Sequence, residues 1–170
     1  MSNSILGTGF QYRVEVVKDG VVVDSFLEDN LMPQVSVDFV ANLLRGAGAS
    51  PISSWYIGIY EGNFTPDANT TPSDLQTEAE ESMAYEEESR PSWQHSYDGE
   101  ALISNADNRA EFTMNASKEI HGAFVISSNS KGGDAGTLLS IARFSSPRQV
   151  EEGSVLRITA GITLTPTGTL

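Results

Sequence analysis

The sequence predicts an all-β protein: a jelly-roll-like β-sandwich of about eight strands, with an N-terminal β-hairpin and one short α-helix. Short apolar runs with period-two alternation recur along the chain, and turns rich in Gly, Pro, Asn and Ser separate them. Hydrophobic residues make up 39% of the 170 residues, which is enough for a core. We therefore expect one β-sandwich domain over residues 11–164, between an N-terminal arm, 1–10, and a C-terminal tail, 165–170.

The clearest local element is a β-hairpin within residues 11–27. Its two strands flank Asp19-Gly20, and a two-residue Asp-Gly loop favours a type I′ turn because both central residues take positive φ. The turn predicts the pairs Lys18–Val21, Val16–Val23 and Val14–Ser25. The face expected toward the core then consists of Tyr12, Val14, Val16, Val23 and Leu27.

One helix is expected to begin at Pro33, a residue suited to the first helical position. Its apolar stripe, at spacings of three and four residues, consists of Val37, Val40, Ala41 and Leu44. Arg45 in the last turn and Gly46 just beyond it are typical of a helix end. We expect this helix to cover an end or a face of the sheet.

The uncharged run Trp55–Tyr60, within residues 54–66, predicts a central strand that is buried on both faces. Gly58 interrupts the run, which suggests a bulge or a second backbone lying close by. Later strands are expected at 110–114, 119–126, 137–144 and 154–164, with two short strands between residues 90 and 103.

The formal net charge is −13, so the chain repels phosphate backbones and we expect no nucleic-acid partner. No apolar run approaches the ~20 residues of a membrane span, so no membrane partner is expected either. No secretory signal is visible, and the chain has no cysteine.

The segment 74–89 is strongly acidic, with glutamates at 78, 80, 81, 86, 87 and 88. The favoured interpretation is a solvated surface excursion. The alternatives are a divalent-cation site, although the ligand spacing of a calcium loop is missing, and a segment that docks on a basic patch of a partner.

The chain contains few residues of the types that catalytic sites use. The chain has two histidines, His95 and His121. It has no nucleophile-elbow motif of a hydrolase, no zinc-protease motif and no phosphate-binding loop. His121 lies in an apolar strand, where a structural role is the more common one. We therefore expect no enzyme, no catalytic residue, no cofactor and no metal site.

Several motifs resemble, in order, those of head decoration (cement) proteins of tailed double-stranded DNA phages, over about residues 11–164. They are Gly20-Val-Val-Val23, Leu43-Leu-Arg-Gly46, Trp55–Pro66, Tyr85-x4-Arg-Pro-x-Trp93, Asn108–Asn115, His121-Gly-Ala-Phe124 and Ile141-Ala-Arg-Phe144. The resemblance implies a jelly-roll-like domain without enzymatic activity, made in the bacterial host cytoplasm and located on the outer capsid surface of the virion. It also implies two kinds of partner: the major capsid protein and further copies of the chain, as a dimer or trimer.

Two other functions stay open: a tail, neck or baseplate component, and a carbohydrate- or cell-surface-binding module in which an exposed Trp93 would stack on sugars. Trp55 is expected in the core. The arm, the tail and the loops 61–73 and 78–90 are long enough to reach neighbours. The candidate interface residues are Ser2, Ile5, Leu6, Phe10, Phe64, Glu86, Glu87 and Trp93.

Overall fold

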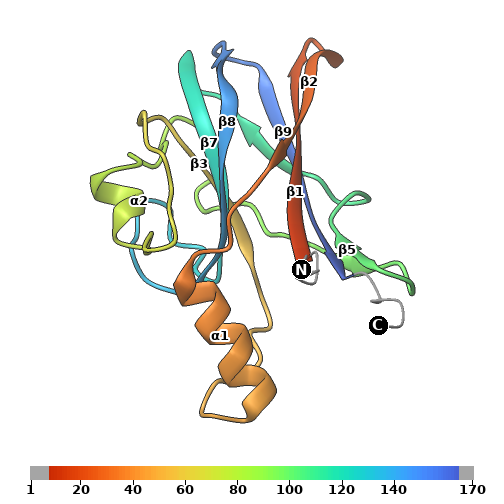
Figure 1. The fold of residues 1–170 in the computed structure, drawn as a ribbon. Coiled ribbons are helices and arrows are strands. Elements are labelled where there is room, and N and C mark those ends of the chain that lie inside the picture. Colours follow the sequence, from red (N-terminus) through yellow and green to blue (C-terminus); the bar gives the residue numbers. More distant parts are fainter. Residues whose placement is uncertain (1–7, 165–170) are drawn as a thin grey trace, which may run out of the picture.

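The computed structural model describes residues 8–164, which form a β-sandwich of two antiparallel sheets, as the sequence predicts (Figure 1). Sheet A contains β1 (Thr8–Lys18), β2 (Val21–Asp29), β4 (Ser96–Tyr97), β5 (Leu102–Ser104), β6 (Ala110–Thr113) and β9 (Val155–Leu164). Sheet B contains β3 (Tyr56–Tyr60), β7 (Lys118–Ile126) and β8 (Leu138–Val150). The helices are α1 (Gln34–Arg45) and α2 (Asp74–Thr77), and the sequence reading missed α2. Neither helix of the described part is long and apolar enough to cross a membrane.

Strand β9 lies in the middle of sheet A and pairs with other strands along both of its edges. One of its edges pairs with β1, and β2 follows as the outer strand. Its other edge pairs with β6 at residues 155–158 and with β5 at residues 161–163, so these two short strands share one edge end to end. Sheet B has the order β3-β7-β8.

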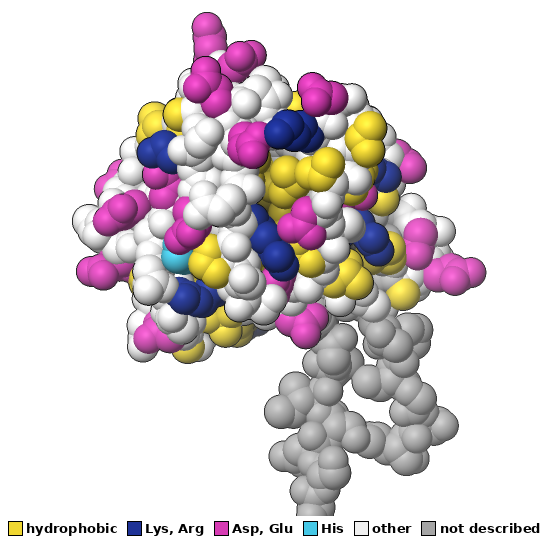
Figure 2. All heavy atoms as spheres, turned by 90° about the horizontal axis from the view of Figure 1, so that it is seen from above, with side chains coloured by type: hydrophobic (Ala, Val, Ile, Leu, Met, Phe, Trp, Pro, Cys, Tyr) yellow, Lys and Arg dark blue, Asp and Glu magenta, His cyan; other side chains and the backbone are white. Residues whose placement is uncertain are grey.

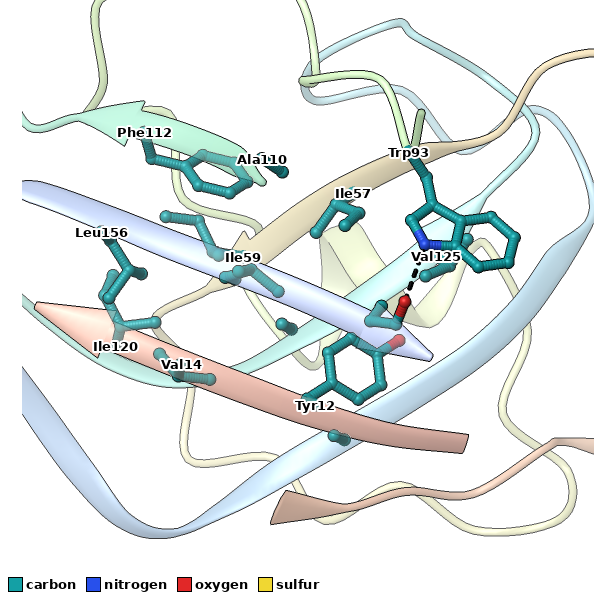
Figure 3. Packing of buried hydrophobic residues seen from close by; sticks show 14 of the residues in the cluster. Tyr12, Val14, Ile57, Ile59, Trp93, Ala110, Phe112, Ile120, Val125 and Leu156 are labelled. Atoms are coloured by element: carbon teal, nitrogen blue, oxygen red, sulfur yellow. Dashed lines mark hydrogen bonds between the residues drawn. The ribbon is translucent and has the colours of Figure 1, made fainter. Parts of the chain in front are cut away.

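The main core lies between the two sheets (Figure 3). Alternate residues of β1 and β9 point into it, because successive side chains of a strand face opposite sides. Trp93 lies at one end of this core, where its indole Nε1 donates a hydrogen bond to the carbonyl of Ala160 over 2.9 Å. The fully buried members from the two sheets include Tyr12, Val14, Ile57, Ile59, Phe112, Ile120, Val125, Leu156 and Ile158.

The hairpin turn is the predicted one, but the register beyond it differs. Asp19 and Gly20 both have positive φ, and Lys18 pairs with Val21. A β-bulge lies between Val16 and Val17, so that Val16 pairs with Asp24 and not with Val23. Because a shift of one residue exchanges the two faces of a strand, β2 turns the opposite face inward from the one that we predicted.

The reversed face has two consequences. Val23 and Leu27, which were expected in the core, are exposed. Phe26 and Glu28 point inward instead: the Phe26 ring packs edge-on against Phe144, and the Glu28 carboxylate accepts hydrogen bonds from the backbone N–H and hydroxyl of Ser145. These contacts join the edge of sheet A to β8 of sheet B, and they close that side of the sandwich.

Strand β3 is buried on both faces, as expected, but it is an edge strand and not a central one. The segment that contains residues 80–91 covers its free edge: Ile57 donates to the carbonyl of Pro91, and Ser82 donates to that of Ile59. The outer face of sheet B carries a second apolar cluster, to which α2 contributes Leu75. The first part of the acidic segment therefore packs on sheet B and covers it.

A glycine is required at position 58 because an aromatic ring lies against it, and not because of a bulge or a second backbone. It pairs directly with Phe124 of β7, and a Cβ at position 58 would lie 2.1 Å from Cζ of that ring. The ring thus fills the space that a side chain at position 58 would occupy.

Candidate interaction surfaces

The two histidines lie in different surroundings. His121 is nearly buried, and its Nε2 lies 2.9 Å from Oε1 of Glu119, which also accepts a hydrogen bond from Gln149. His95 is exposed, and its ring packs on Trp93 with the centroids 4.4 Å apart. Within residues 8–164, no group of three or more His, Cys, Asp or Glu side chains is placed to hold a metal ion.

The acidic segment is anchored by a buried ion pair, which corrects the expectation of a purely solvated excursion. Nε and Nη2 of Arg90 donate to the two carboxylate oxygens of Glu81 over 2.8 and 2.7 Å, and both side chains are fully buried. The guanidinium also donates to the carbonyls of Ser128 and Gly133. Since a buried charge is tolerated only when it is paired and hydrogen-bonded, this pair serves the fold.

Further contacts tie the same segment to its neighbours. Lys131 Nζ donates to the carbonyls of Tyr85 and Glu87, and it lies 3.6 Å from the centroid of the Tyr85 ring. Burial lowers the pKa of Lys131 and raises that of Tyr85. The Glu87 carboxylate accepts from the backbone N–H and hydroxyl of Thr113. The glutamates that remain exposed are Glu78, Glu80, Glu86 and Glu88.

The predicted interface residues fall into three groups. Phe10 and Trp93 are buried in the main core, so neither is available to a partner, and the prediction is wrong for both. Phe64 and Glu87 are half-buried, and Glu86 is exposed. Ser2, Ile5 and Leu6 lie outside the described residues.

Sequence reasoning missed a surface at the start of β2, which we call the hairpin surface: Val21, Val22 and Val23. Val21 is 63% and Val23 59% exposed. Within the described residues β2 pairs only with β1, so its outer edge has no partner strand. An exposed apolar edge strand is a template for pairing with another chain.

Lys18 and Asp24, two of the charges near the hairpin surface, are paired. Lys18 Nζ contacts Glu151 at 2.5 Å, and this hydrogen bond raises the pKa of Lys18 and lowers that of Glu151. Asp24 lies 3.5 Å from Arg148. Figure 2, which looks onto the end of the molecule that carries the β1–β2 turn, shows hydrophobic side chains gathered between acidic and basic ones. This end therefore presents apolar area among charges of both signs.

A second apolar surface corrects the prediction for the helix. Helix α1 begins at Gln34, one residue later than expected, with Pro33 as its N-cap, and it ends as expected, with Gly46 in the left-handed conformation. Its predicted stripe faces away from the core. Val35, Ser36 and Phe39 face the sandwich instead. Leu44 is 84% exposed. The stripe lines a groove, which we call the α1 groove, with Met32, Val37, Val40, Ala41, Leu44, Ile162 and Leu164.

No model of a known protein family matches the sequence, and no curated protein is significantly similar to it.

Proposed function

We propose that this chain is a structural virion protein: a decoration protein that binds the outer surface of a phage head and stabilises the shell by bridging major capsid protein subunits. The observation that carries the proposal is the hairpin surface, where neighbouring valines lie exposed on an edge strand without a partner in the described part. Exposed apolar area of this kind marks protein–protein contact sites.

The motifs that resemble those of phage head decoration proteins contact one another in this fold. A Cβ on Gly122 would lie 2.2 Å from the Tyr60 ring and from the carbonyl of Ala142, so the motifs around these residues fit only as a set. Phe124 fills the space above Gly58 in the same way. The motifs thus specify a scaffold, which favours a protein whose role depends on shape and contact area.

The hairpin surface suits β-strand addition, in which an extended segment of the partner pairs with the free edge of β2. Main-chain hydrogen bonds would hold that segment, and the valines would supply the apolar contact. Many copies, each burying a standard-size area of roughly 1,600 Å² in total, would add up to a shell that resists the outward pressure of packaged DNA.

The charge of −13 favours the outer surface of a head over its interior, because packaged phosphates repel an acidic protein. It also favours capsid surfaces with basic or neutral patches. A tail, neck or baseplate position remains the alternative within the same particle. The carbohydrate-binding alternative loses its main support, since Trp93 is buried and its indole N–H is bonded to Ala160.

The test is to add purified protein to virions that lack it and to measure both binding and survival of heat or osmotic shock. Wild-type protein is expected to bind in hundreds of copies per head, an order of magnitude that follows from a shell built of many identical subunits. It is also expected to restore resistance. The variant Val21→Asp/Val23→Asp is expected to bind at least tenfold more weakly, because it places two carboxylates in an apolar contact.

A matched control carries the same added charge elsewhere. Met83→Asp/Leu102→Asp also replaces two exposed apolar side chains by aspartate, away from the hairpin surface, and should bind like wild type. Equal binding of both variants would reject the hairpin surface as the contact. Six or twelve copies per particle, located at the neck, would reject the head position.

A further inference from the structure

The α1 groove is apolar, and residues 8–164 leave it uncovered. Val37, Leu44 and Leu164 are all exposed along it, and Leu164 keeps 45% of its surface accessible. The residues of β9 that line it, Ile162 and Leu164, belong to the same face as Leu156, Ile158 and Ala160 of the main core. The groove is therefore an extension of the core face that runs past the end of the packed interior.

The N-terminal arm enters the described fold at the rim of this groove. Thr8, the first described residue, pairs with Leu164, which itself lines the groove. Helix α1 extends beyond the end of the sheets at which β1 begins (Figure 1). The point at which the described fold begins therefore lies beside a residue that lines the α1 groove.

The arm has the chemistry to fill an apolar groove. It contains the adjacent apolar pair Ile5-Leu6, and no charged side chain precedes Arg13. Leu6 lies four residues before Phe10, whose side chain is buried on the inner face, so an extension of β1 would place Leu6 on that face. The tail, residues 165–170, offers only Pro166 and the final Leu170.

The short distance along the chain favours the arm of the same molecule over that of a second copy. Ile5 and Leu6 are only three and two residues from Thr8, which corresponds to a reach of about 7–10 Å. A second copy could insert the same pair only by bringing its own body within that distance. Each body carries a net charge of −13, which opposes such a close approach.

We propose that the α1 groove is the docking site of the chain's own N-terminal arm, with Leu6 as the anchoring side chain. The contact would bury the helix stripe that the sandwich leaves exposed, and it would fix α1 against the end of sheet A. This inference does not depend on the capsid function, because the groove and the hairpin surface lie at opposite ends of β1.

Disulfide trapping tests the proposal, because the chain has no cysteine of its own. Leu6→Cys is combined with Ala41→Cys in the groove, and the full-length protein is oxidised at low concentration. An intramolecular disulfide is expected, detected as a monomer that has lost two hydrogens by intact-protein mass spectrometry. The control pairs Leu6→Cys with Val21→Cys at the far end of the hairpin, about 30 Å away along β1.

Each result decides the question. A monomeric disulfide formed at least tenfold faster than in the control supports docking of the chain's own arm. Disulfide-linked dimers would overturn the proposal in favour of a second copy, and a rate equal to the control would show that the arm does not occupy the groove.

A second measurement avoids cysteines. Ile5→Asp/Leu6→Asp should uncover the groove and increase the binding of an apolar fluorescent dye severalfold, whereas Ser2→Asp/Ser4→Asp, with the same added charge, should leave it unchanged. Equal dye binding by the two variants would contradict the proposal.

Discussion

Arg90 and Glu81 show how this acidic chain uses charge inside its fold. Every oxygen of the Glu81 carboxylate has a donor, since Gln76 and the backbone of Gly132 add to the two bonds from Arg90. Both side chains lie beneath the segment that covers the edge of β3. The pair therefore fixes the segment 81–90 against the loop that contains Ser128 and Gly133.

Replacing Glu81 by Ala is expected to lower the free energy of unfolding by about 3–5 kcal/mol, because it leaves the buried guanidinium uncompensated. The double variant Glu81→Leu/Arg90→Met removes both charges and should lose clearly less. Urea unfolding of Glu81→Leu, of Arg90→Met and of the double variant measures this as a double-mutant cycle. A double variant as unstable as the sum of the singles would contradict the account.

Ser36 is a polar residue in an apolar place. It is the only fully buried residue of α1, and its hydroxyl has no hydrogen-bond partner in the part of the chain that the structure describes. Ser36→Ala removes the unpaired hydroxyl and introduces the best helix former, so it should raise the free energy of unfolding by about 1 kcal/mol. Urea unfolding checks this, with Ser50→Ala on the exposed loop as the control. A loss of stability would reveal a partner for the hydroxyl.

The Asp98 carboxylate stabilises a turn, and this stabilisation depends on pH. Its carboxylate accepts hydrogen bonds from the backbone N–H groups of Glu100, Ala101 and Leu102, and these bonds lower its pKa. A lowered pKa means that the ionised carboxylate stabilises the turn. This contribution is complete above the unfolded pKa of about 3.9 and is lost as the pH falls through the folded value.

An NMR titration of the Asp98 carboxyl should therefore give a midpoint below the ordinary value, with the amide shifts of residues 100–102 moving in step. Asp98→Asn keeps the acceptor oxygen and should abolish the pH dependence of those shifts. A midpoint at or above the ordinary pKa of an aspartate would contradict the assignment.

At the scale of elements, Gly58 determines how β3 packs on β7. Gly58→Ala would drive a methyl group into the Phe124 ring, so we expect a loss of about 2–3 kcal/mol in the free energy of unfolding. Gly9→Ala, where no described atom lies within 4 Å of the added Cβ, should change it by less than about 0.5 kcal/mol. Combining Gly58→Ala with Phe124→Leu should recover part of the loss, and no recovery would argue against the collision.

Apart from α2, the helix and the main strands could be predicted from the sequence, whereas the register and the inward face of β2 could not. The Asp-Gly turn and the hairpin strands follow from turn chemistry and alternation. The bulge between Val16 and Val17 does not, because three consecutive valines, 21–23, carry no periodicity that would indicate which face is inward. Only contacts with β8, such as that between Phe26 and Phe144, determine the face.

The helix illustrates the same limit. The spacing of Val37, Val40, Ala41 and Leu44 correctly indicates an amphipathic helix. Its sequence also contains a second apolar pair, Val35 and Phe39, and this pair packs on the sandwich. Periodicity shows which residues share a face, but it does not show which face a neighbour covers.

The candidate surfaces were less predictable than the fold. Trp93 and Phe10 have the residue types of an interface, yet tertiary packing buries them. The hairpin surface escaped prediction because exposure depends on the register shift in β2. The acidic segment was recognised, but its internal ion pair requires Arg90 to fold back under it, which no local pattern indicates.

At the scale of the whole molecule, two exposed apolar surfaces lie at the two ends of β1. One end carries the hairpin surface, which we assign to a partner, and the other carries the α1 groove, which we assign to the chain's own arm.

The most direct test of this account is a cryo-electron-microscopy reconstruction of virions that carry the chain. The account predicts density for the β-sandwich on the outside of the head, repeated by the capsid symmetry, with the β1–β2 turn against the major capsid protein. Density confined to the tail, the neck or the inside of the shell would contradict it.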